Sequence, residues 1–177
     1  QYVVDGLLIG CVYGLAAMGI TLIWGVMDVI NMAHGVLIAL GSFGMYLLFT
    51  GLGINPYLGV VLAGAGGLLL GVGIYRVAIR RVLNASHLST LLATFAINMI
   101  LVGLGTAAFS TNPRAVDVNL GSLTIGSVTV QTTRLIAALA SILIAGALYL
   151  FLNRTTPGKF IRAITNNRDA AELVGIH

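Results

Sequence analysis

Residues 7–27 read LLIGCVYGLAAMGITLIWGVM, and this uncharged stretch decides the fold class. A helix needs about 20 consecutive apolar residues to cross the hydrocarbon of a bilayer, and the run has that length. Its apolar residues are continuous, whereas the strands of a membrane barrel alternate polar and apolar residues. Because a chain in lipid must satisfy its own backbone hydrogen bonds, the run has to be a helix. We therefore predict an all-α integral membrane protein.

The rest of the chain supports the same fold class. It has 177 residues, of which 58% are hydrophobic and 8% are charged, whereas soluble domains carry about 25% charged residues. Four more apolar runs approach or exceed the spanning length, at 33–50, 57–75, 88–109 and 135–152, and the first and last of these are short. We expect about five transmembrane helices in a single membrane domain, 1–177, that includes a cytoplasmic segment at 153–177.

Basic residues predict the orientation of the spans. They gather at Arg76, Arg80 and Arg81 after the third run, and at Arg154, Lys159, Arg162 and Arg168 after the fifth. Loops rich in Lys and Arg face the cytoplasm, and five spans place both clusters on that side. The N-terminus and the segments 51–56 and 110–134 are then outside. Since the basic residues lie at the ends of apolar runs, the net charge of +4 does not indicate nucleic-acid binding.

The outer segment 110–134 contains a hairpin pattern. Residues 123–130 read LTIGSVTV, an alternation of apolar and small polar residues with Gly-Ser at its centre. Two strands joined by a two-residue turn have this pattern. We predict a small extracytoplasmic β-hairpin near 121–131, which is either a lid over the outer surface or a contact for a delivery protein.

The stretch DVINMAHG, residues 28–35, interrupts the apolar sequence between the first two runs. One interpretation is a cytoplasmic turn in which Asn31 caps the second helix. The other is a helix broken inside the membrane, whose free backbone groups face a central cavity. In both cases Asn31 and His34 should face protein or water rather than lipid. His34 is expected to form hydrogen bonds rather than to bind a metal or carry protons.

Asn98 is the other costly polar residue, because it lies in the middle of the fourth run. It either lines a pathway or joins two helices by hydrogen bonds. The chain has no nucleophile and base pair, no paired carboxylates, no metal-ligand spacing and no phosphate-binding glycine loop. We therefore expect a protein that is not an enzyme and that needs no cofactor and no metal.

The tail after the fifth run predicts two short amphipathic helices. Residues 159–166 and 168–174 keep coherent apolar faces only if the chain kinks at Asn166-Asn167, where Asn166 can cap the second helix. The first helix suits an anionic membrane surface. The second carries two acids and one base, so it suits a protein partner better. Its apolar residues are Ala170, Ala171, Leu173 and Val174, and Gly175 is placed to end it.

These residues resemble a known family. Asp169-Ala170-Ala171 followed by three residues and Gly175 is similar to the E-A-A-x-x-x-G coupling motif of ABC importer permeases, with Asp in place of Glu. The sequences 158–176 and 25–35 resemble the branched-chain amino-acid permeases of the LivH/LivM type. The resemblance covers nearly the whole chain. Val36 departs from it, because the family often has an acid there. The family also continues with further spans, so we expect the chain to be truncated at its C-terminus.

The resemblance implies a permease subunit of an ABC importer for branched-chain or related amino acids, in a bacterial or archaeal inner membrane. Its implied partners are two cytoplasmic ATP-binding subunits, a second permease subunit (a paralogue or a copy), an extracytoplasmic solute-binding protein and membrane lipid, but no nucleic acid. The expected pathway residues are Asn31, His34, Gly35 and Asn98. The expected residues for coupling to the ATPase are Arg162, Asp169, Ala170, Ala171 and Gly175.

Two alternatives remain open. The form Asn31-Met32-Ala33-His34-Gly35 also resembles the permeases of urea and short-amide importers. A passive channel is the weaker alternative, because the Asn-Pro-Ala boxes of aquaporins come in pairs and only a faint single counterpart is found here.

Overall fold

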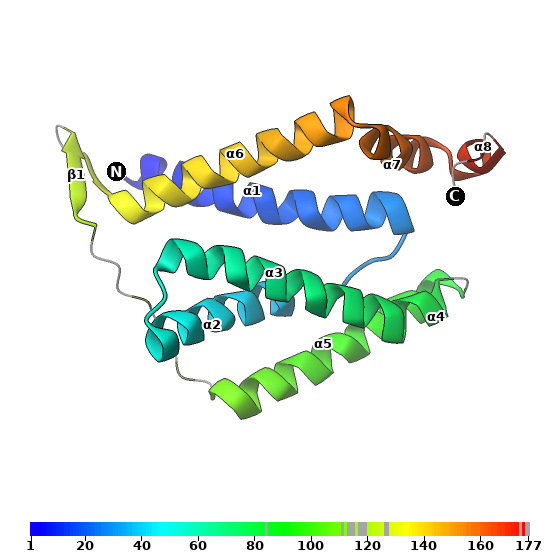
Figure 1. Cartoon of the computed structure of the whole chain (residues 1–177), viewed down its shortest axis with the longest axis horizontal. Coiled ribbons are helices and arrows are strands. Elements are labelled where there is room, and N and C mark those ends of the chain that lie inside the picture. The colour runs from blue at the N-terminus through cyan, green and yellow to red at the C-terminus, as the bar shows by residue number, and fades with distance from the viewer. Residues whose placement is uncertain are drawn as a thin grey trace. The chain divides into compact units, whose positions relative to one another are not determined.

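The computed structural model describes residues 1–83, 85–110, 112, 116, 120–125, 128–173 and 175. Five helices in it are long and apolar enough to cross a membrane, so the predicted multi-pass, all-α fold is confirmed (Figure 1). They are α1 (Tyr2–Met27), α2 (His34–Leu52), α3 (Pro56–Ile74), α5 (His87–Phe109) and α6 (Thr132–Arg154). The third span is longer than expected, because the π-helix η1 (Tyr75–Ile79) and the short α4 (Arg80–Val82) extend α3. The tail forms α7 (Thr156–Asn166) and α8 (Arg168–Leu173).

The chain folds into two compact units. The terminal unit comprises Gln1–Asp28 and Asn119–His177, and the central unit comprises Val29–Val118. The single membrane domain expected for 1–177, with its cytoplasmic segment 153–177, stays a prediction.

In the terminal unit, α1 and α6 lie side by side and run parallel (Figure 1). At their first turns, Arg134 Nη1 of α6 lies 3.0 Å from Asp5 Oδ1 of α1. Near the end of α1, Gly25 approaches Thr165 of α7, the helix that follows α6. Three spans separate α1 from α6 in sequence, so an alternating chain must make the two helices parallel. The packing therefore agrees with the span count.

The central unit follows the same alternation. Here α2 packs against α3, with Met45 beside Gly59, and also against α5. The rings of Phe43 in α2 and Phe109 in α5 stack with their centroids 4.6 Å apart. Met32, just before α2, binds Thr94 in the first half of α5, and Phe43 lies further along α2 beside the end of α5, so these two helices also run parallel.

A two-stranded antiparallel sheet precedes α6, as predicted. It consists of β1 (Ser122–Ile125) and β2 (Val128–Gln131), with Ser122 paired to Gln131. Gly126 and Ser127, the predicted turn, lie outside the described residues. Thr132, the first residue of α6, donates its backbone N–H to the carbonyl of Gly121 over 3.3 Å. The hairpin is thereby tied to the start of the last span.

Candidate functional site

A non-helical break separates α1 from α2, as both interpretations of residues 28–35 expect. Helix α1 ends at Met27, and Asp28 takes a left-handed conformation with φ of 53°. The Asp28 N–H still closes the last turn by donating to the carbonyl of Trp24 over 2.8 Å. Asp is one of the few residues that enter this conformation without a large cost. The next helix begins only at His34, so Asp28–Ala33 forms a non-helical connection.

Asn31 shapes this connection from within. Its side-chain oxygen accepts the N–H of Ala33 at 3.0 Å, and its carbonyl accepts the N–H of His34 at 3.3 Å. Such local bonds from Asn make a turn that guides the chain into a helix. In the described part of the chain, the amide nitrogen of Asn31 makes no hydrogen bond, and the side chain is half-buried. Asn31 therefore serves the turn with its oxygen and keeps two donors for another partner.

Thr94, in the first half of α5, binds the connection, although the sequence does not single it out. Thr94 Oγ1 lies 2.8 Å from the carbonyl oxygen of Ile30 and 3.3 Å from the N–H nitrogen of Met32. Thr94 is seven residues beyond His87, the first residue of α5, which corresponds to about 10 Å along the helix. The connection thus lies beside α5 beyond the first turn of that helix, and its place inside the membrane stays a prediction.

Side chains in the connection point to two sides. Val29 and Ala33 are buried, with 2% and 1% of their surface exposed, whereas Ile30 and Met32 are 45% and 46% exposed. The connection therefore packs against the protein through Val29 and Ala33, and it leaves the larger side chains of Ile30 and Met32 exposed.

The other predicted pathway residues lie nearby in the central unit. His34 is the first residue of α2 and is half-buried, and Gly35 follows it and is exposed. Asn98 is half-buried and lies one helical turn beyond Thr94, on the same side of α5. No hydrogen bond joins Asn98 to Asn31 among the described residues. The structure thus places Asn31 in the connection, His34 and Gly35 directly after it at the start of α2, and Asn98 on the face of α5 that holds the connection.

The tail has the predicted kink, with one correction. Asn166 was expected to cap the second tail helix, but it is the last residue of α7, and Asn167 caps α8 instead. The Asn167 backbone is extended, with φ of −158° and ψ of 104°. Its side-chain oxygen accepts the N–H of Ala170 at 3.0 Å, which is the bond of an N-cap residue. Asn166 cannot do this because its own backbone still belongs to the helix.

The predicted docking face of α8 is divided. Ala171 is buried with 3% of its surface exposed, whereas Leu173 is 88% exposed and Ala170 is also exposed. Ala171 thus packs inside this chain, and the coupling role expected for it stays a prediction. Gly175 is exposed with φ of 84°, as expected of a residue that ends a helix. The side chain of Asp169 lies outside the described residues.

Two side-chain hydrogen bonds hold the corner between α6 and α7. Thr155 ends α6 and begins α7, and its hydroxyl accepts the N–H of Gly158 at 3.1 Å. Arg162, a predicted coupling residue, donates from Nη1 to the side-chain oxygen of Asn153 on α6. These bonds fix the direction in which α7 leaves the span.

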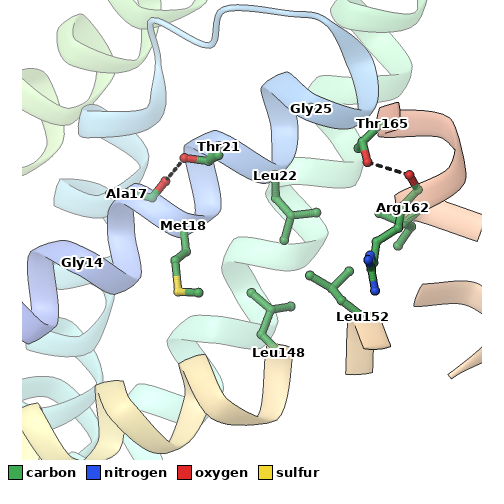
Figure 2. A pocket seen from close by; sticks show the side chains of 11 residues that line it. Gly14, Ala17, Met18, Thr21, Leu22, Gly25, Leu148, Leu152, Arg162 and Thr165 are labelled. Atoms are coloured by element: carbon green, nitrogen blue, oxygen red, sulfur yellow. Dashed lines mark hydrogen bonds between the residues drawn. The ribbon is translucent and has the colours of Figure 1, made fainter. Parts of the chain in front are cut away.

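A groove of about 450 Å³ lies where α1, α6 and α7 meet in the terminal unit. Figure 2 shows Met18 and Leu22 of α1 and Leu148 and Leu152 of α6 along it, with Arg162 of α7 at one end. Its lining is mostly apolar. The groove marks the place where the tail rests on both spans of its unit.

Comparisons with known proteins identify the family. The family model described as "Branched-chain amino acid transport system / permease component" matches residues 2–177. The branched-chain amino acid permease protein LivH of Escherichia coli K12 is 28% identical over the whole chain, and BraD of Pseudomonas aeruginosa is 25% identical over the whole chain. A probable LivH of Methanocaldococcus jannaschii is 31% identical over 92% of this chain and 53% of its own length.

The chain covers 62% of the length of the LivH and BraD relatives. No solved structure matches it significantly. The relatives are named for branched-chain amino acids, so the urea alternative is not favoured. The match over residues 2–177 shows that the chain belongs to the family of permease components of branched-chain amino acid transport systems.

Proposed function

We propose that this chain is a permease subunit of an ABC importer that carries branched-chain amino acids across a bacterial or archaeal inner membrane. It works with two cytoplasmic ATP-binding subunits, a second permease subunit and an extracytoplasmic solute-binding protein. In this proposal the chain is a transport subunit, and the ATP-binding subunits supply the ATPase activity. The observation that carries this proposal is the non-helical break between α1 and α2, which contains the half-buried Asn31.

The chemistry of the break suits an amino acid with an aliphatic side chain. The N–H groups of Gly35 and Val36 at the start of α2 have no acceptor among the described residues. The N-terminus of a helix favours a carboxylate, and a Cβ at Gly35 would meet no atom within 4 Å, so the backbone is open to close approach. The exposed side chains of Ile30 and Met32 offer apolar contact to a branched substrate.

The tail is arranged to transmit movement to this break. Helix α7 contacts α6 through Arg162 and Asn153 and contacts α1 at Gly25, three residues before Asp28. A docked helix binds its groove through a few apolar side chains, and on α8 the Leu173 side chain is 88% exposed. We infer that ATP-driven closure of the ATPase subunits pulls on α8 and α7, and that α1 passes the displacement to the break.

Reconstitution of the complete importer tests the proposal. The full-length permease, its partner permease, the ATPase subunits and the solute-binding protein are placed in proteoliposomes, and uptake of labelled leucine, isoleucine and valine is measured with ATP and with a non-hydrolysable analogue. We expect uptake only with ATP, and no competition by excess urea. Uptake that continues without ATP would support the passive channel, and inhibition by urea would support the short-amide importer.

A further inference from the structure

Thr94 has the most enclosed side chain at the break. Its exposed fraction is 0%, and it is the only fully buried large side chain among the described residues. Its hydrogen-bond partners Ile30 and Met32 lie 64 and 62 residues away in sequence, on either side of Asn31. A single hydroxyl therefore holds both neighbours of a predicted pathway residue.

The backbone of the connection needs such a partner. A non-helical segment leaves carbonyl and N–H groups without the bonds that a helix supplies, and each unsatisfied group in a membrane costs several kcal/mol. A hydroxyl is both a donor and an acceptor, so Thr94 can satisfy the carbonyl of Ile30 and the N–H of Met32 together. An alanine or valine at this position would satisfy neither group.

The hydroxyl also has a second acceptor on its own helix. Thr94 Oγ1 lies 3.0 Å from the carbonyl oxygen of Leu91, close to its 2.8 Å distance from that of Ile30. The hydroxyl has one hydrogen, so it donates to one of these oxygens at a time. When the connection moves away, the hydrogen can turn to Leu91 and the buried hydroxyl keeps a partner.

We propose that Thr94 is a positioning residue that latches the Asn31 connection against α5 and releases it during the transport cycle. This inference rests on the proposed function, because it takes the connection to be part of the substrate pathway. Thr94 acts through the backbone of Ile30 and Met32 and has no contact with substrate in the mechanism.

Thr90 provides a matched control on the same helix. It lies one turn before Thr94, is 4% exposed, and its hydroxyl donates to the carbonyl of His87 over 2.8 Å. Thr90→Val and Thr94→Val therefore remove the same hydroxyl from the same kind of buried site. Only the second change removes the bonds to the connection.

The first measurement does not depend on transport. Met32→Cys is introduced into a cysteine-free importer, with Cys11→Ala in this chain, because the Met32 side chain is exposed and reports on the connection. We expect Thr94→Val to speed labelling by a small hydrophilic thiol reagent by about fivefold to tenfold, the effect of one or two lost hydrogen bonds. Thr90→Val and Thr94→Ser should label at the rate of the unchanged protein.

The second measurement is the amount of amino acid carried per ATP hydrolysed in proteoliposomes. Thr94→Val should lower this ratio about fivefold, whereas a loss of folded transporter would lower uptake and hydrolysis in proportion. Thr94→Ala removes the hydroxyl without placing a methyl group against the backbone, and it should give the same two results if Thr94→Val does not accumulate.

Two outcomes overturn the latch. One is equal behaviour of the Thr94→Val and Thr90→Val variants in both measurements. The other is a Thr94→Ser variant as impaired as Thr94→Val, because the lost methyl group and not the hydroxyl would then be responsible. If the unchanged importer carries no branched-chain amino acid, the proposed function fails, and the labelling rates still decide whether Thr94 holds the connection.

Discussion

A Cβ atom on Gly158 would lie 2.6 Å from the Cα atom of Leu152, because the first turn of α7 rests directly on the last turn of α6. Only a residue without a side chain fits this contact. Gly158 is buried, and its N–H is bound by Thr155 at the same corner. The relative position of the last span and the tail therefore depends on this glycine.

We predict that Gly158→Ala opens the corner between α6 and α7. Forcing a methyl group into a packed site costs about 1–3 kcal/mol, so the purified permease should lose thermal stability and the importer should lose ATP-driven uptake. Gly146→Ala in α6 is the matched control, since a Cβ there would meet no atom within 4 Å. Similar melting temperatures for the two variants would contradict the close approach at Gly158.

Leu173 and Ala171, two of the apolar residues of α8, should respond differently to a charge. Leu173 is 88% exposed and Ala171 is 3% exposed. Leu173→Glu should leave the tail folded and reduce ATP-driven uptake about tenfold, the effect of about 1.4 kcal/mol at a docking contact. Ala171→Glu should instead make the tail sensitive to protease, because it buries a carboxylate without a partner. Limited proteolysis and uptake separate the two effects, and full uptake by the Leu173 variant would exclude docking through this side chain.

Gly175→Arg tests the end of the same helix. The φ of 84° at Gly175 belongs to the left-handed region, where a side chain is strained. We expect the variant to insert normally and to lose much of the stimulation of ATP hydrolysis by the solute-binding protein. Gly53→Arg serves as the control, because Gly53 ends α2 with φ of 63° and lies away from the tail in sequence. Equal loss in both variants would point to a general folding defect.

Asn31 and Asn98 are both polar residues that lipid would not favour, and the sequence predicts both as pathway residues. The structure gives their side chains different hydrogen bonds. The Asn31 side chain accepts the N–H of Ala33, whereas the Asn98 side chain has no hydrogen bond in the described part of the chain. We predict that Asn31→Leu lowers uptake about tenfold, because it leaves the buried N–H of Ala33 without its acceptor at a cost of about 1–3 kcal/mol. Asn98→Leu should have a smaller effect. Asn31→Asp keeps the acceptor and should preserve insertion. Equal and mild effects of the two leucine variants would remove Asn31 from the pathway.

The spans were predictable because their apolar runs are continuous and long. The two basic clusters lie on one side of the membrane if the chain has five spans, and the parallel packing of α1 with α6 supports that number. The hairpin was predictable from alternation around Gly126-Ser127. In both cases neighbouring residues in the sequence determine the element, and no contact with a distant part of the chain is needed to predict it.

Thr94 was not predictable for the opposite reason. Thr21 and Ser42 are also hydroxyl residues within spans, and they donate to the carbonyls of Ala17 and Ile38 in their own helices. Thr94 differs from them only through contacts made across more than sixty positions. The sequence alone shows only that Thr94 is a polar residue in the same apolar run as Asn98. The burial of Ala171 was not predictable either, because the pattern of one short helix does not show which of its apolar residues pack against the rest of the protein.

The contact between Gly25 and Thr165 can be tested by a pair of compensating changes. A Cβ on Gly25 would lie 3.2 Å from the Thr165 Cγ2 atom, so Gly25→Ala pushes α7 away from α1 by a few tenths of an ångström. Thr165→Ser removes that methyl group and keeps the hydroxyl that donates to the carbonyl of Arg162 over 3.0 Å. We expect Gly25→Ala to lower the uptake per ATP hydrolysed, Thr165→Ser to have little effect, and the double variant to recover most of the loss.

The double-mutant cycle should give a coupling energy of about 0.5–1 kcal/mol, as residues in contact do. Additive effects would show that α7 does not act on α1 at this point, and the movement of the tail would then have to reach the break through α6.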